Sequence, residues 1–149
     1  MTYEELQRRL DEARRQQLFL NTLKKEREMV LADIVGVQGM RYDKPYVSSS
    51  HISDLSEKLI SIENQMRFYD NRIADTLELL TALRQDVADV IDLCDTPEQK
   101  TVLNLRYLQG LEWSEIPKAM NYAERHPYNL HKAALLTILR KLRAKECSK

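Results

Sequence analysis

An apolar heptad pattern from residue 55 to residue 94 is the strongest structural signal in this chain. Its members are separated alternately by four and three residues, and only Thr76 is clearly polar. They are Leu55, Leu59, Ile62, Met66, Tyr69, Ile73, Thr76, Leu80, Leu83, Val87, Val90 and Cys94. This is the a/d spacing of a coiled coil, and it predicts one helix from about residue 53 to residue 93. Such a helix would be roughly 60 Å long, and its apolar seam needs a partner.

A second, less regular helix is predicted from about residue 2 to residue 35. Its apolar positions are Leu6, Leu10, Ala13, Leu20, Leu23, Val30, Leu31 and Ile34. The polar residues Gln17, Lys24 and Arg27 interrupt a strict a/d pattern. Residues from about 36 to 52 include Gly39, Pro45 and three consecutive serines, a composition typical of a loop. The two helices are therefore expected to form an antiparallel hairpin. With only 3 Gly and 4 Pro in 149 residues, the whole chain is expected to be all-α.

The segment after residue 94 predicts a separate small domain, so the expected division is 1–94 and 95–149. Thr96 is placed as an N-cap, Pro97 as the first helical residue and Gln99 as the capping-box partner. The helix should end near Leu108, before Gly110. Its expected apolar face consists of Val102, Leu103, Leu105 and Leu108, with Arg106 and Tyr107 beside it.

Residues 110–135 have the layout of a helix-turn-helix. A short helix from about residue 115 to residue 120, capped by Ser114, is followed by Asn121, which tolerates a left-handed backbone. The next helix has basic and amide side chains on its leading turns. The shared core is predicted from Ile116, Met120, Tyr122, Leu130 and Ala134, and Trp113 is expected to pack under the first helix. A helix, a second helix, a turn and a long basic helix make a minimal DNA-binding domain.

The motif at residues 102–107, followed by Gly110, Trp113, the turn and residues 130–143, resembles region four of bacterial sigma factors. In layout, the whole chain resembles the ArpU/RinA type of phage and prophage transcriptional regulators. The resemblance implies that residues 123–134 enter the major groove of DNA, and it makes RNA polymerase a candidate further partner.

Three positions depart from the sigma-like pattern: Pro117, Ala123 and Pro127. Pro117 is tolerated, because as the third helical residue after Ser114 its missing amide would have no helical partner. Ala123 stands where such domains usually have a Ser or Thr N-cap, and it has no side-chain oxygen for the first free amides. Pro127 replaces an aliphatic residue, and proline fits only the first turn of a helix. The reading helix is therefore expected to begin nearer His126 than Glu124.

Charge is distributed unevenly along the chain, although its formal net value is zero. Residues 96–149 hold ten Lys and Arg against five Asp and Glu, a net +5, and residues 1–95 carry the opposing −5. This asymmetry favours duplex DNA as the partner of the C-terminal domain. The candidate DNA-contacting residues are Glu124, Arg125, Tyr128, Asn129, His131 and Lys132. Asn and Arg can pair with adenine and guanine, and Lys and Tyr can hold phosphates; the alternative is that they are ordinary solvated side chains.

Neither catalysis nor a cofactor is indicated. His126 and His131 are five residues apart, which does not suit a metal pair on one helix face, so no metal site is predicted. The serines before His51 lack a glycine-framed nucleophile turn, and no glycine-rich phosphate loop occurs. The two cysteines are far apart, and there is neither a signal peptide nor a membrane-spanning run. A non-enzymatic, cytoplasmic protein is expected.

Two functions fit these features. The first is a sequence-specific DNA-binding transcriptional regulator of phage or prophage type, dimeric through its N-terminal helices because helix-turn-helix proteins commonly read paired half-sites. The second is a non-catalytic assembly protein, either a coiled-coil adaptor or a DNA-packaging subunit of small-terminase type. For the hairpin itself, the alternative to a homodimer is that its two helices cover only each other.

Overall fold

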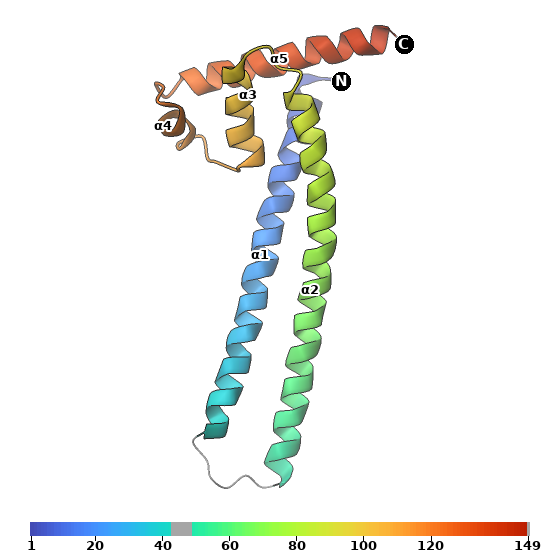
Figure 1. Cartoon of the computed structure of the whole chain (residues 1–149), viewed down its shortest axis with the longest axis vertical. Helices are drawn as coiled ribbons and strands as arrows, with labels where there is room; N and C mark the ends of the chain where they lie inside the picture. Colours follow the sequence, from blue (N-terminus) through green and yellow to red (C-terminus); the bar gives the residue numbers. More distant parts are fainter. Residues whose placement is uncertain (43–48, 149) are drawn as a thin grey trace. The chain divides into compact units, whose positions relative to one another are not determined.

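A computed structural model describes residues 1–42 and 49–148, with side chains described outside residues 35–52. In this part of the chain every regular element is helical, which confirms the all-α prediction (Figure 1). The long helices are α1 (Tyr3–Tyr42) and α2 (Ser49–Ile91). The shorter elements are α3 (Pro97–Leu103), the π-helical turn η1 (Asn104–Leu108), α4 (Ile116–Met120) and the longer helix α5 (His126–Cys147).

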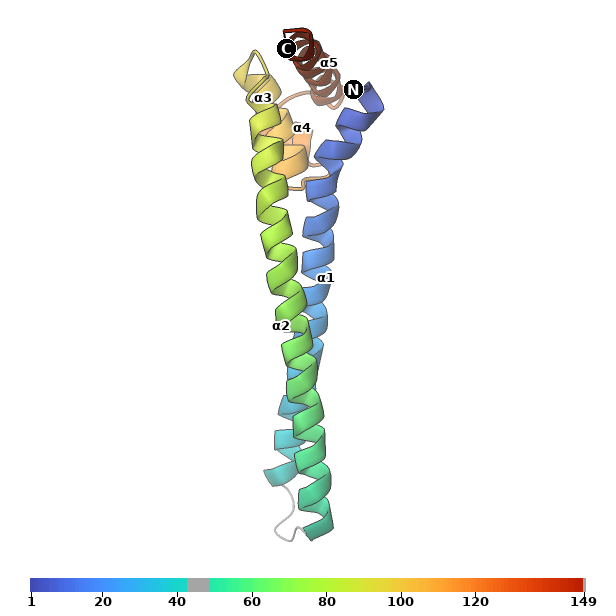
Figure 2. The ribbon, with the colours of Figure 1, turned by 90° about the vertical axis from the view of Figure 1, so that its right-hand side faces the viewer.

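The chain forms two compact units. Unit 2 is Leu18–Glu78, and unit 1 combines Met1–Gln17 with Leu79–Lys149. The predicted boundary at residues 94 and 95 does not coincide with these units. In unit 1, Arg14 of α1 pairs with Glu112, and Arg84 of α2 donates to the Leu108 carbonyl at 3.3 Å, so both long helices contact the C-terminal segment. In unit 2, the α1 and α2 segments lie side by side and antiparallel (Figures 1 and 2).

The predicted seam of α2 faces inward throughout. None of its twelve positions is exposed, and Thr76, its polar member, is buried at 7% exposure. The Thr76 hydroxyl donates to the carbonyl of Arg72 at 2.7 Å, so its burial leaves no unpaired donor. Ion pairs join the two helices beside the seam: Arg27 to Asp70 at 2.6 Å in unit 2, and Arg9 to Asp86 in unit 1. On α1 the pattern is less regular, as expected, and Leu31 is 44% exposed.

The predicted loop from about 36 to 52 is wrong at both ends. Helix α1 continues to Tyr42 and α2 already begins at Ser49. Gly36 and Gly39 lie inside α1, because a glycine costs a helix only about 1 kcal/mol relative to alanine, which is too little to end one that is otherwise well supported. The predicted loop residue Pro45 lies outside the described residues.

The start of α3 follows the predicted cap. Thr96 has an extended backbone and its side chain accepts a hydrogen bond from the Gln99 amide at 3.2 Å. The reciprocal half of the capping box is missing, because the buried Gln99 Oε1 has no hydrogen-bond partner. The helix ends in η1 and then at Gly110, whose φ of 77° is in the left-handed region. Of the predicted face, Val102 and Leu103 are buried.

Helix α3 packs against α5 to form the core of the C-terminal helices. The buried side chains there are Val102, Leu103, Tyr107, Ile116, Pro117, Pro127, His131, Ala134, Leu135, Ile138 and Leu139. Leu105 and Leu108 are only half-buried, and Tyr107, one helical turn after Leu103, takes the core position instead. From α5, Lys141 donates to the Leu93 carbonyl at 2.7 Å and pairs with Asp95, which ties the α2–α3 connection to α5.

Candidate nucleic-acid interface

The turn between α4 and α5 has the geometry that Asn121 predicts. Asn121 is left-handed, with φ 56° and ψ 41°. The Tyr122 amide donates to the Pro117 carbonyl at 3.0 Å and the Asn121 amide to the Lys118 carbonyl at 3.4 Å. These two bonds form a Schellman motif, which satisfies the last carbonyls of a helix and reverses the chain. The corner of the helix-turn-helix is therefore built by the backbone, with Asn121 as its left-handed residue.

Both helices of the pair start without a side-chain cap. The predicted Ser114 cap is wrong: Glu115 is the N-cap of α4 and makes no side-chain cap bond. The Glu115 carboxylate instead accepts from the Glu112 amide at 3.0 Å, one turn upstream. Helix α5 begins at His126, as Ala123 and Pro127 predict, and Pro127 is buried in its first turn.

An aromatic cluster lies beneath the start of α5. Trp113 stacks on Tyr128, with ring centroids 4.5 Å apart, and meets the edge of His131 at 4.9 Å. The Arg106 guanidinium lies 5.1 Å from the Trp113 ring, an arrangement that favours a cation–π interaction. The Tyr107 hydroxyl and His131 Nε2 are 2.6 Å apart and share a hydrogen bond. Trp113 is thus an anchor whose ring contacts Tyr128 and His131 of α5 and Arg106 of η1.

His131 corrects the predicted DNA face. Its side chain is only 6% exposed and contacts Trp113 and Tyr107, so its ring is not available to a phosphate. Burial, followed by the nearby Arg106 charge, lowers the pKa of His131 to about 4. The ring is therefore neutral near pH 7 and can form its bond with Tyr107 at no cost in buried charge. The sequence analysis placed His131 on the surface because histidine is polar. Its hydrogen-bond partner in the core, Tyr107, was not apparent from the sequence.

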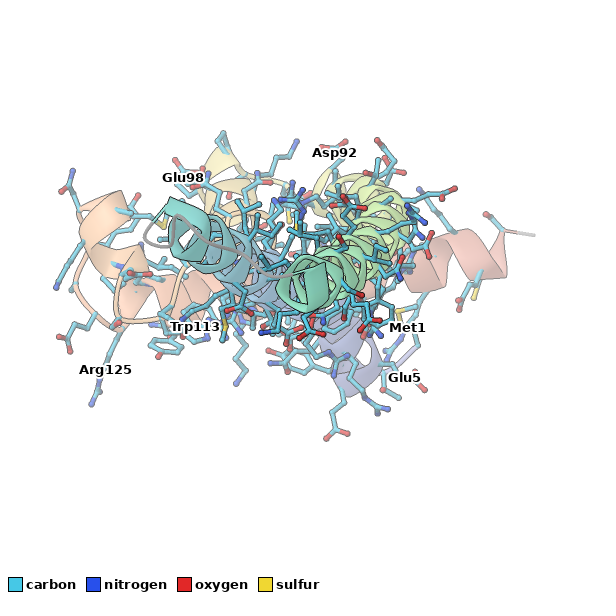
Figure 3. All side chains as sticks on the ribbon, turned by 90° about the horizontal axis from the view of Figure 1, so that it is seen from below. Met1, Glu5, Asp92, Glu98, Trp113 and Arg125 are labelled. Carbon is cyan, nitrogen blue, oxygen red and sulfur yellow. The ribbon has the colours of Figure 1, made fainter. Side chains whose placement is uncertain are left out.

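The other predicted residues are exposed. Glu124, Arg125, Asn129 and Lys132 all lie on the solvent side of α5 and the turn before it, and Figure 3 shows Arg125 extending away from the ribbon. Tyr128 is 49% exposed, with one face of its ring held by Trp113. Arg125, Asn129 and Lys132 follow at intervals of four and three residues, which aligns them on one face of a helix. Glu124 is the only acidic residue of this group.

Two arginines hold the loop that carries Trp113. Arg14 on α1 pairs with Glu112 at 2.5 Å, and Arg106 on η1 lies 3.7 Å from the same carboxylate. Arg106 also donates to the Leu111 carbonyl at 3.1 Å. The side chains of Arg14 and Arg106 are only 17% and 14% exposed. The N-terminal part of α1 therefore stabilises the segment that precedes α4. Because Arg14 and Glu112 are far apart in the sequence, no local sequence pattern predicts this contact.

The comparisons with known proteins find no relative of this chain, so the description of the site depends on its geometry. No protein-family model, curated protein or solved structure matches this chain. Among the described residues, no helix is long and apolar enough to cross a membrane, and no three His, Cys, Asp or Glu side chains gather as a metal site would require.

Proposed function

We propose that this protein is a sequence-specific DNA-binding transcriptional regulator of phage or prophage type, reading duplex DNA with the first turns of α5. The observation that carries the proposal is the exposed line of Arg125, Asn129 and Lys132 at the start of a helix that follows a Schellman corner. In helix-turn-helix proteins the second helix enters the major groove with its N-terminal residues on base edges. The resemblance to sigma region four and to ArpU/RinA-type regulators supports the same role.

The chemistry of Arg125, Asn129 and Lys132 fits two kinds of DNA contact, to base edges and to phosphates. Asn129 has the donor and acceptor pair that fits adenine, and Arg125 can form two bonds with guanine. Lys132 is a point charge suited to a phosphate. Tyr128, already packed on Trp113, offers a hydroxyl with little further loss of side-chain freedom. Base reading is thus assigned to Arg125 and Asn129, and positioning on the backbone to Lys132 and Tyr128.

Binding to duplex DNA is expected to weaken at least about tenfold when salt rises from about 50 to 200 mM. The reason is that each phosphate neutralised by this basic domain releases condensed counterions, and added salt opposes that release. Fluorescence anisotropy of the full chain with a duplex from upstream of its own operon would measure it. Salt-independent affinity, or no binding at low salt, would remove DNA as the partner.

Alanine substitutions should separate base reading from backbone contact. Arg125→Ala and Asn129→Ala are each expected to cost roughly 1–3 kcal/mol on the preferred site and to relax base preference at one position. Lys132→Ala should weaken all sequences about equally and reduce the salt dependence. Affinities on the preferred duplex and on singly substituted duplexes provide the comparison. If Lys132→Ala alters base preference while Asn129→Ala does not, the assignment of the reading face is wrong.

An assembly role is the second candidate, as a coiled-coil adaptor or a small-terminase-like packaging subunit. Among the side chains of unit 2 that the structure describes, seven large apolar ones are exposed: Leu18, Phe19, Met29, Leu31, Ile60, Phe68 and Leu77. The Arg72 guanidinium lies 5.8 Å from the Phe19 ring and 5.2 Å from the Phe68 ring, so one cation joins two of them. A contiguous exposed apolar patch marks an association surface, and Phe19 and Phe68, linked through Arg72, supply such a patch here. We propose a homodimer through these helices under either function, and sequence-specific binding to the region upstream of its own operon separates the regulator from the assembly protein.

Replacing both Phe19 and Phe68 with serine is expected to shift the protein from dimer to monomer without loss of helix. Both rings are exposed, at 41% and 52%, so their removal costs the isolated chain little packing. Light scattering gives the mass and circular dichroism the helix content. Leu136→Ser is the matched control, since Leu136 is also 52% exposed but lies on α5. A monomeric wild-type protein, or a double variant that stays dimeric, contradicts this interface.

A further inference from the structure

The solvent face of α5 continues beyond Lys132. Ala133, Leu136, Arg140 and Arg143 are exposed on later turns of the same helix. Leu136 is 52% exposed, although the buried residues Leu135 and Ile138 lie close to it in sequence. Its spacing of seven residues from Asn129 and four from Lys132 keeps it on the face that carries those side chains. An apolar side chain therefore lies within an otherwise polar and cationic line.

The charges around Leu136 indicate which partner covers it. Lys132 precedes it by one turn, and Arg140 and Arg143 follow it. The Arg140 side chain is 73% exposed, and its guanidinium lies 3.6 Å from the Asp95 carboxylate. A face with cations on both sides of one leucine suits a polyanion better than an apolar protein surface. The major groove of duplex DNA presents one apolar group between its phosphate walls, the C5-methyl group of thymine.

We propose that Leu136 reads a thymine through its C5-methyl group, as a specificity-determining residue on α5. This inference rests on the proposed DNA-binding function. Leu136 lies about 10 Å along the helix from Asn129, at 1.5 Å per residue. Along the groove this corresponds to roughly two to three base pairs. The recognised site therefore contains a thymine two to three base pairs from the base that Asn129 reads.

The test uses the full-length chain and a duplex selected from a randomised pool at low salt. Each thymine of the selected site is replaced in turn by deoxyuridine, which lacks only the methyl group, and dissociation constants are measured by anisotropy. At one position the wild-type protein is expected to lose about fourfold in affinity, the effect of exposing one methyl group. Leu136→Ala should bind the thymine and uracil duplexes equally. Leu79→Ala, at a leucine 48% exposed on α2, should keep the wild-type preference for thymine.

The outcomes separate this inference from the proposed function. A selected site whose affinity is unaffected by every uracil substitution, or a thymine preference that survives in Leu136→Ala, overturns the role of Leu136 and leaves the regulator intact. Failure to bind any duplex at low salt overturns both. Retained helix content in Leu136→Ala, checked by circular dichroism, ensures that a lost preference reports the contact and not unfolding.

Discussion

Leu80→Asp is expected to lower the free energy of unfolding by several kcal/mol. Leu80 is 3% exposed and lies on the apolar seam of α2, so the variant loses the burial of a leucine and places an unpaired carboxylate out of water. Since domains are stable by only about 5–15 kcal/mol, a loss of this size removes much of the total. Thermal and urea unfolding followed by circular dichroism would measure it.

The neighbouring residue supplies the control. Leu79 is 48% exposed, one position away on the same helix, and Leu79→Asp introduces the same charge and loses the same side chain at the surface. It should change stability by no more than about 0.5 kcal/mol. Leu83→Asp, at a half-buried seam position, should fall between the two. Equal melting curves for the Leu79 and Leu80 variants would show that the seam is not buried in solution.

Acidification from pH 7 to pH 5 is expected to destabilise the protein by about 2 kcal/mol through His131 alone. The pKa of His131 is about 4 in the folded chain, against about 6.5 for an unperturbed histidine. As the pH falls through 6.5, His131 takes up a proton in the unfolded chain but not in the folded chain, so the free energy of unfolding decreases. The loss approaches the order of 3 kcal/mol near pH 4 and then levels off.

Variants can isolate this contribution from the carboxylates. Urea midpoints between pH 5 and pH 7 should show a weaker pH dependence for His131→Gln than for the wild-type protein. His126→Gln, at an exposed histidine in the same helix, should keep the wild-type profile. Tyr107→Phe should cost about 1–3 kcal/mol, because it leaves the buried His131 Nε2 without its partner. An unchanged profile in His131→Gln would mean that the ring is solvated and titrates normally.

Much of the helical framework was predictable because its determinants are local. The heptad seam of α2, the Thr96 cap and the left-handed Asn121 each depend on residues a few positions apart. The late start of α5 followed from Ala123 and Pro127 for the same reason. The ends of the long helices were less accessible, since Gly36 and Gly39 favour a break only weakly and remain within α1.

The candidate DNA face was predicted in part. Arg125, Asn129 and Lys132 are exposed together because helical periodicity alone places them on one face. His131 was assigned to that face by its polarity, and the assignment failed because Tyr107 satisfies its ring from a position 24 residues away. Leu136 was not among the predicted residues, and its 52% exposure is a finding of the tertiary structure.

The sequence by itself determined the order of the helices, the Thr96 cap, the corner at Asn121 and the charge difference between the two parts of the chain. Only the tertiary structure decided which polar residues are buried, that Trp113 supports α5, and that Arg14 at the start of α1 holds Glu112. The physical reason is the sequence separation over which each interaction acts. Capping and periodicity act between residues within about one turn, whereas burial depends on which distant segments meet in the folded chain.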